Sequence, residues 1–240
     1  MSLSKFLEEV RHNQLATIQN KKLEYALMSE IDACFVQIAT TLTNPQDLLT
    51  PAMFARCHAA WRGACATGTA GQIAETFVLL RSALEYAAYG LFMNKTAGAA
   101  DVWIDRNESP EAKAAMRFTF QLRNIRPVIA TCDRKLAKVF DTLYEHAIEQ
   151  GGHPNPHGVF SSAKVSPIPG GGEQHSHTHL HGDGPILEFG LKSLIETGIC
   201  CLYILQHISA FTARFELLGV KARLNTLRRN SSRLVKQPDR

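Results

Sequence analysis

Helical periodicity runs through most of this chain and stops between Gly151 and Gly184, and this interruption most constrains the fold. On both sides of it, apolar residues recur every three or four positions, which places them on one face of a helix. Within it, glycines and prolines separate two strand-like segments. The pattern therefore predicts an all-α fold, a multi-helix bundle with a small β-hairpin or extended insertion near residues 158–182.

Capping signals set the expected ends of the helices before this interruption. Ser109-Pro110 is typical of a helix N-cap followed by proline at the first helical position. We expect that helix over 109–124, because Pro127 lacks a backbone donor and disfavours a helical residue before it. The next helix is expected over 129–150, where two glycines end it.

The last helix is expected from Pro185 to Leu218. Its stretch 199–205 is apolar on every side, which is typical of a helix at the centre of a bundle or in a dimer interface. We therefore expect a homodimer formed through the 185–218 helix. The domain prediction is a single helical bundle over 1–218, with a histidine-rich insertion over 152–184 and a basic, flexible tail over 219–240.

Composition and charge bear on which partners the protein can bind and on its cellular compartment. The segment 221–240 holds seven Lys or Arg residues and one acid; such a segment can contact nucleic acid, but a short run without aromatics is more typical of a solvated terminus. No apolar run approaches the ~20 residues of a membrane span. Acids in the first ten residues are unlike a signal peptide, and six cysteines show no CxxC spacing. The sequence predicts a cytoplasmic protein without a membrane segment.

Histidines concentrate in the insertion, where six of the ten in the chain fall. Four of them alternate, so an extended strand would project them from one face. Imidazole is a common ligand of zinc, nickel and iron, and a hairpin would bring the histidines of its two strands together. The sequence therefore predicts a site for a divalent transition metal (Zn, Ni or Fe). Its candidate ligands are His153, His157, His175, His177, His179 and His181.

Two prolines stiffen the turn from His153 to His157, which would hold its histidines rigidly. The same stiffness suits a tight helix exit, so both interpretations stay open. If the metal is catalytic, Glu149 or Asp183 is the candidate base that would activate a metal-bound water.

A second group of candidates lies on a long helix expected over 73–94 and on the helix expected over 129–150. Arg81 and Glu85 stand four residues apart at the edge of an apolar face. This pair either ties its helix to a neighbour as a partly buried ion pair or lines a cleft together with Tyr144. We favour the structural interpretation, because ion-pair networks alter charge without any catalytic role.

The segments LLRSALEYAAYGLF (79–92) and YEHAIEQGGHPNPHG (144–158) resemble a group of bacterial helical domains placed near the HEPN superfamily. The resemblance marks Arg81, Glu85, Tyr144 and His153. It implies a helical bundle, frequently dimeric, associated with bacterial stress or defence. HEPN ribonucleases carry an arginine followed by a histidine after four to six residues, and this chain departs from that spacing, which argues against ribonuclease activity.

Three functions therefore stay open. The leading hypothesis is a helical protein with a metal-capable histidine site at the base of a hairpin. The second is a metal-dependent hydrolase or nuclease that uses the 153–181 histidines. The third is a non-catalytic module in which the hairpin is an interaction arm.

Overall fold

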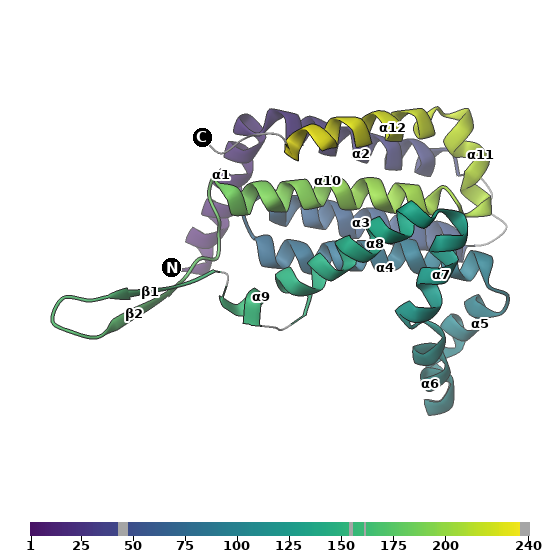
Figure 1. Ribbon diagram of the computed structural model, residues 1–240, viewed down its shortest axis with the longest axis horizontal. Helices are drawn as coiled ribbons and strands as arrows, with labels where there is room; N and C mark the ends of the chain where they lie inside the picture. Colours follow the sequence, from purple (N-terminus) through teal and green to yellow (C-terminus); the bar gives the residue numbers. More distant parts are fainter. Residues whose placement is uncertain (43–47, 154–155, 161, 236–240) are drawn as a thin grey trace.

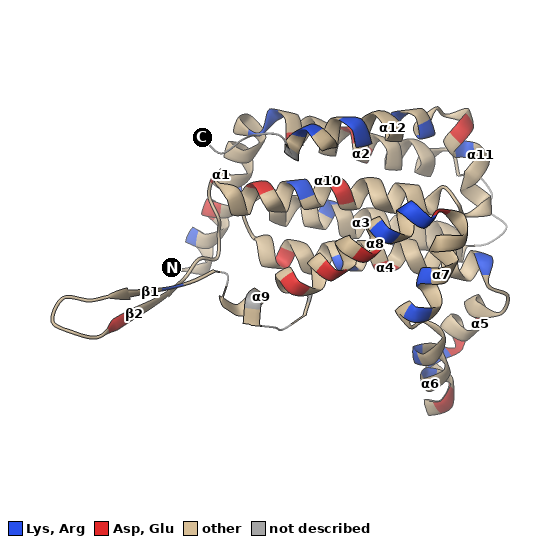
Figure 2. Cartoon of the chain, viewed as in Figure 1, with Lys and Arg blue, Asp and Glu red and all other residues tan. Residues whose placement is uncertain are grey.

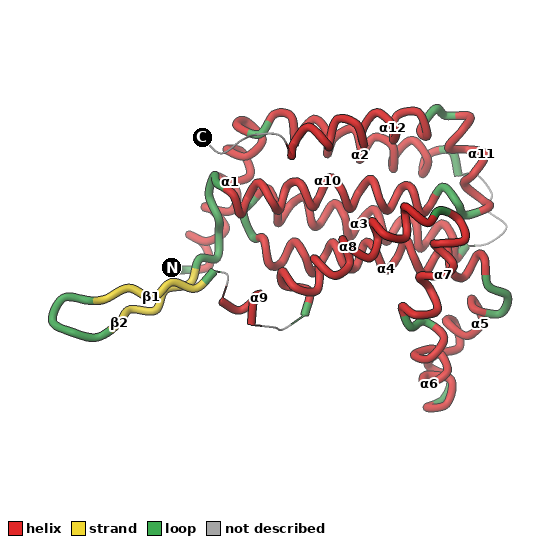
Figure 3. Tube along the Cα trace, in the orientation of Figure 1, coloured by secondary structure: helices red, strands yellow, loops and turns green. Residues whose placement is uncertain are grey.

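The computed structural model describes residues 1–42, 48–153, 156–160 and 162–235. Figure 1 shows a helical bundle with a two-stranded arm extending from one end. The α-helices, in chain order, are α1 Leu3–Asn20, α2 Lys22–Thr40, α3 Leu49–Thr69, α4 Ile73–Lys95, α5 Ala99–Ile104, α6 Pro110–Thr119, α7 Leu122–Cys132, α8 Arg134–Ala147, α9 Pro156–Phe160, α10 Pro185–Leu205, α11 Ser209–Leu217 and α12 Val220–Ser231. The shorter helical turns are η1 Asp105–Asn107, η2 Ile148–Gly152 and η3 Ser232–Val235, and the strands are β1 Ala163–Pro167 and β2 Glu173–His177. The all-α class and the hairpin insertion are both confirmed (Figure 3).

Helix α10 is the axis of the bundle. It packs against α2, α3, α4, α8 and α12, and 14 of its 21 residues are buried. Trp61 of α3 donates its ring N–H to the Leu194 carbonyl at 2.9 Å. The apolar stretch 199–205 is therefore covered within one chain, so it no longer argues for a second chain at this helix, and the homodimer stays a prediction.

The expected single helix over 185–218 is wrong in its C-terminal part. The helix ends at Leu205 and α11 begins at Ser209, with the two helices bent by 112°. Ile208 between them is extended and fully buried. Asn94 of α4 holds the corner, because its Oδ1 accepts from Ser209 N–H at 3.2 Å and its Nδ2 donates to Ser209 Oγ at 2.9 Å.

The expectation of a flexible tail is also wrong for residues 220–231, which form α12. This helix packs against α2, α10 and α11. Arg223 donates to Glu30 and Gln37 of α2. The buried residues of α12 follow helical spacing; they are Val220, Leu224, Leu227 and Ser231. Residues 236–240 of the expected tail lie outside the described residues.

The expected helix over 109–124 is split, and Pro127 lies inside α7 rather than beyond its end. Ser109 caps α6 as expected, accepting from Ala112 N–H at 3.0 Å. Phe120 then turns into the core against Tyr89 and the chain restarts as α7. The proline costs α7 one backbone hydrogen bond, and burial of the apolar face of α7 against α4 overrides that cost.

Candidate functional site

The histidine-bearing arm is an antiparallel ribbon that extends away from the bundle (Figure 1). Its register runs from Ala163 opposite His177 to Pro167 opposite Glu173. Every residue of both strands is exposed except Ser166, which is half-buried. The strands cover less than the extended insertion expected near residues 158–182, since residues 156–160 are helical and β2 ends at His177.

Glycines make the tip of the arm possible. Gly170, Gly171 and Gly172 have φ values of 94°, 95° and 107°, a region that residues with a side chain rarely adopt. Gly171 N–H donates to the Ile168 carbonyl at 3.2 Å and Ile168 N–H donates to the Gly172 carbonyl at 3.2 Å. The tip is therefore closed by its own backbone bonds.

The base of the arm is fastened to the bundle at His181. Its N–H donates to the Gly71 carbonyl at 2.9 Å, and its Nε2 lies 3.1 Å from Ser162 Oγ across the ribbon. Gly71 has a φ of 84°, and a Cβ there would lie 2.1 Å from the His181 carbonyl oxygen. Burial lowers the pKa of His181, which favours the neutral form of its ring.

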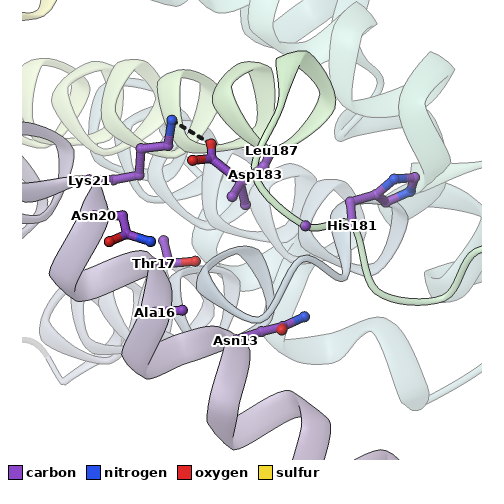
Figure 4. A pocket seen from close by; sticks show the side chains of 9 residues that line it. Asn13, Ala16, Thr17, Asn20, Lys21, His181, Asp183 and Leu187 are labelled. Carbon is purple, nitrogen blue, oxygen red and sulfur yellow. Dashed lines mark ion pairs between the residues drawn. The ribbon is translucent and has the colours of Figure 1, made fainter.

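Lys21, at the corner between α1 and α2, holds the segment that follows the arm (Figure 4). Its Nζ lies 2.6 Å from Asp183 Oδ1 and 2.7 Å from Glu188 Oε1, and only 15% of the lysine side chain is exposed. Burial acts to lower the pKa of Lys21, but hydrogen bonds and charges from Asp183 and Glu188 outweigh it and raise the pKa. Asp183 therefore serves as an ion-pair partner that ties α10 to the α1–α2 corner.

The predicted metal ligands that the structure describes do not lie together in one chain. His175, His177 and His179 are exposed on the arm, and only the rings of the last two approach each other, with centroids 5.6 Å apart. His153 is exposed just after η2, and the side chain of His157 lies outside the described residues. In the part of the chain that the structure describes, no three His, Cys, Asp or Glu side chains are grouped as a metal ion requires.

The two candidate bases, Glu149 and Asp183, also have different surroundings. Glu149 is exposed on η2, whereas Asp183 is paired with Lys21. Neither belongs to a three-ligand group among the described side chains. The metal-dependent hydrolase thus stays a prediction, and the described residues of one chain form no metal site for it.

Arg81, Glu85 and Tyr144 are brought together, as the sequence suggested. Tyr144 donates its hydroxyl to Glu85 Oε1 at 2.7 Å, and Arg81 Nε donates to the same oxygen at 3.0 Å. Arg81 also lies over the Tyr144 ring, 5.5 Å from its centroid. Burial, with the nearby Glu85 carboxylate, raises the pKa of Tyr144 to about 12. The three side chains satisfy one another and join α4 to α8, so the geometry favours the structural interpretation.

Sequence reasoning missed a second charged group around a buried histidine. His58 is buried and its Nε2 lies 2.7 Å from Asp32 Oδ1. Arg62 donates to both oxygens of the same carboxylate at 2.6 and 2.8 Å. His58 and Arg62 are one turn apart on α3, but the sequence holds no signal that pairs them with Asp32 of α2.

A cleft of about 490 Å³ between α8, α10 and α12 was also missed. Apolar side chains such as Leu143 and Ile199 line it together with Glu196. Burial raises the pKa of Glu196 against the opposing charges of Lys192 and His146. Cys200 lines the cleft too, but burial raises the pKa of its thiol and leaves it unreactive. The cleft is large enough to hold a small apolar group.

Comparison of the chain with protein-family models, with curated proteins and with solved structures returned no match. The likeness to HEPN-like domains therefore stays a prediction. Among the described residues, no single helix is both long and apolar enough to cross a membrane; α10 and α11 meet that test only as a pair, bent by 112°.

Proposed function

We propose that this protein is a non-catalytic assembly module, in which two copies join through their arms by pairing β2 with β2. The observation that carries the proposal is the open backbone edge of β2. A two-stranded ribbon exposed on both faces is marginally stable alone. A further strand on one edge would stabilise it, in the manner of β-strand addition.

The hydrogen bonds at the two ends of the ribbon identify which residues face inward. Ile168 N–H donates to the Gly172 carbonyl at the tip, and Thr178 N–H donates to the Ser162 carbonyl at the base. Hydrogen-bonded and non-bonded pairs alternate along an antiparallel ladder. The even-numbered residues of both strands are therefore bonded to each other, and the odd-numbered ones direct their N–H and C=O groups outward.

On β2 these outward residues are Glu173, His175 and His177. Among the described residues, no other element donates to or accepts from their backbone. On β1, Pro167 stands at an outward position and has no N–H to offer. The β2 edge is thus open to a further strand, whereas the β1 edge is partly closed.

A symmetric pairing of β2 with its copy fits this edge. If His175 lies opposite His175 of the second copy, Glu173 lies opposite His177, and each opposed pair can exchange two backbone hydrogen bonds. Lys164 and Glu173 are the only Lys, Arg, Asp or Glu residues over 163–177, so two neutral arms meet without net repulsion (Figure 2). At about 0.5–1.5 kcal/mol for each hydrogen bond, the dimer is expected to be weak and reversible.

Sedimentation velocity of the untagged protein in EDTA, over a wide range of concentration, tests the proposal. The wild type should pass from monomer to dimer as concentration rises. His175→Pro removes one outward N–H and should shift this transition to much higher concentration. His175→Thr keeps the N–H and should dimerise like the wild type.

Val165→Pro is the matched control, because Val165 lies directly opposite His175 and faces the other edge of the same ribbon. It should leave the dimer intact. A wild type that stays monomeric throughout would overturn the proposal. So would a His175→Pro variant that associates as strongly as Val165→Pro, because association would then use another surface.

A further inference from the structure

We infer that the cleft between α8, α10 and α12 binds a single-chain carboxylate, with the apolar chain inside the cleft and the head group on Lys135 and Arg228. This inference goes beyond the proposed function and does not depend on it, because the residues that line the cleft belong to the bundle. At about 490 Å³ the cleft is within the usual size range of small-molecule sites. Three features carry the inference: the apolar walls, the charges along the cleft, and the hydrogen bonds of its hydroxyl groups.

Apolar side chains form the walls of the cleft. Helices α8 and α12 both pack against α10 (Figure 1). Leu136, Val139 and Leu143 line the cleft from α8 at helical spacing, and Ile199 lines it from α10. Val139 is 47% exposed although it stands on this apolar face. An alkyl chain in the cleft would cover the wall and remove its apolar surface from water.

The two ends of the cleft differ in charge. Burial raises the pKa of Tyr203, Arg228 lowers it and Asp133 raises it, so both charged groups lie near this hydroxyl. Farther along the cleft, Glu196 of α10 lies 3.8 Å from Lys192. The helical rise of 1.5 Å per residue puts about 10 Å between Glu196 and Tyr203. The cleft is therefore long enough to hold an extended chain between a cationic end at Tyr203 and an acidic end at Glu196.

Three cations, Lys135, Lys138 and Arg228, line the cleft. Among the described residues, none of the three forms an ion pair. Asp133 also lies here, but its Oδ1 accepts from Lys135 N–H at 2.7 Å and from Leu136 N–H at 3.2 Å and so caps α8. Positive charge is therefore in excess at this end of the cleft, which complements an anionic head group.

The hydroxyl groups that line the cleft donate their protons to the protein itself. Tyr203 donates to Asn225 Oδ1 at 2.9 Å. Thr142, Ser231 and Ser232 each donate to a backbone carbonyl three or four residues earlier. The strong donors left for a ligand are thus the ammonium and guanidinium groups, which form their strongest hydrogen bonds with a carboxylate or another anion.

The acidic end restricts the ligand to one charged head group. Burial raises the pKa of Glu196, which shows that this part of the cleft disfavours negative charge. A second carboxylate placed there would be desolvated beside Glu196, whereas an apolar chain end would contact Leu143 and Ile199. The cleft therefore fits a monocarboxylate with an unbranched apolar chain, and octanoate is a probe of suitable length.

Isothermal titration calorimetry of the full chain with octanoate, below the concentration at which octanoate forms micelles, tests the inference. The wild type should bind one octanoate per chain. Octanol and octylammonium lack the anionic head group, and octanedioate carries a second one. Each of these three should bind at least about tenfold more weakly than octanoate, which corresponds to the loss of one charge-assisted hydrogen bond.

Variants locate the ligand. Arg228→Gln and Lys135→Gln each remove a cation from the cleft and should weaken octanoate binding by about tenfold. Arg229→Gln is the matched control, because it removes the same charge from the next residue of α12, which donates to Thr226 Oγ1 and does not line the cleft. It should bind like the wild type. Val139→Glu places a carboxylate on the apolar wall at an exposed position and should abolish binding.

Several outcomes would overturn the inference. One is a wild type without saturable octanoate binding. Another is octanol or octylammonium that binds as tightly as octanoate, because the cations would then select nothing. A loss in Arg229→Gln as large as that in Arg228→Gln would mean that net charge alone attracts the anion. Unchanged binding in Val139→Glu would place the ligand outside the cleft.

Discussion

At the residue scale, His58 shows how burial sets a charge state. Its ring stacks on Phe35 with centroids 4.6 Å apart and planes 5° from parallel. Burial lowers the pKa of His58 more than the adjacent Asp32 raises it, and Arg62 adds to the lowering. The folded protein therefore binds a proton at this ring less readily than the unfolded chain does.

This shift predicts loss of stability in mild acid. Below the unfolded pKa near 6.5 the unfolded chain binds more protons, so the free energy of unfolding should fall as pH drops from 7.5 to 5, by at most about 1.4 kcal/mol per pH unit for one group. His181 and His207 shift in the same direction through burial. Urea unfolding should show a shallower pH dependence for His58→Gln. An unchanged slope in that variant, or a changed one in His12→Gln, would contradict the assignment.

Substitution of Gly71 should lower stability through two effects that can be separated: backbone strain at its left-handed φ and a clash with the His181 backbone. Gly71 and Gly98 both adopt left-handed φ values, 84° and 74°, but a Cβ on Gly98 would meet nothing within 4 Å. Alanine at either position should cost about 1–3 kcal/mol for the backbone strain. Gly71→Ala should cost more, because it also displaces the His181 backbone from the base of the arm. Equal losses in chemical unfolding would mean that the arm is not fastened there.

At the element scale, two helical glycines differ in how closely a neighbouring helix approaches them. Gly198 of α10 lies against Trp61 and Ile31, where a Cβ would come within 2.6 and 2.8 Å, whereas a Cβ on Gly63 of α3 would meet Leu79 at an ordinary 3.4 Å. Alanine in a helix is favoured over glycine by about 1 kcal/mol. Gly63→Ala should therefore raise the free energy of unfolding, while Gly198→Ala should lower it by about 1–3 kcal/mol through overpacking. Thermal unfolding of the two variants compares them directly, and a stabilised Gly198→Ala would contradict the packing of α10 on α3.

The helices themselves follow from apolar spacing and capping residues, as the Ser109 cap of α6 illustrates. The corners do not, because their partners come from elsewhere in the chain. The bend between α10 and α11 depends on Asn94 of α4. Pro127 is kept inside α7 by burial against α4. For α12 the signal was present in the helical spacing from Val220 to Ser231, and the many charged residues of that segment obscured it.

For the candidate site too, the sequence predicted the local structure but not the contacts between distant segments. Gly170 and its neighbours predicted a turn. Alternation predicted an extended segment up to His181, whereas β2 ends at His177. Which backbone groups remain open depends on the register, and a shift of one residue would exchange the inward and outward positions. The arm points away from the bundle, and its histidines are grouped with no third ligand among the described residues; both are properties of the folded structure.

At the scale of the whole molecule, the helical bundle and the arm differ in how much of their surface is buried. The bundle buries one continuous core around α10, whereas the strands of the arm are exposed and the arm is fastened to the bundle near its base. Local stability should follow this division. The backbone amides of α10 should exchange hydrogen slowest and those of β2 fastest, and the proposed pairing of two arms would slow the exchange of the outward β2 amides.

Shortening the arm tests this division. Residues 165–175 can be replaced by Asn-Gly, because the inward-facing pair Lys164 and Ser176 can close a two-residue turn. At a protein concentration below association, the free energy of unfolding should stay within about 0.5 kcal/mol of the wild type, as for a surface change. Leu194→Ala, in the centre of α10, should cost about 2–5 kcal/mol in the same assay. A shortened protein as unstable as Leu194→Ala would mean that the bundle needs its arm to fold. A stable one that no longer dimerises would assign the arm to assembly alone.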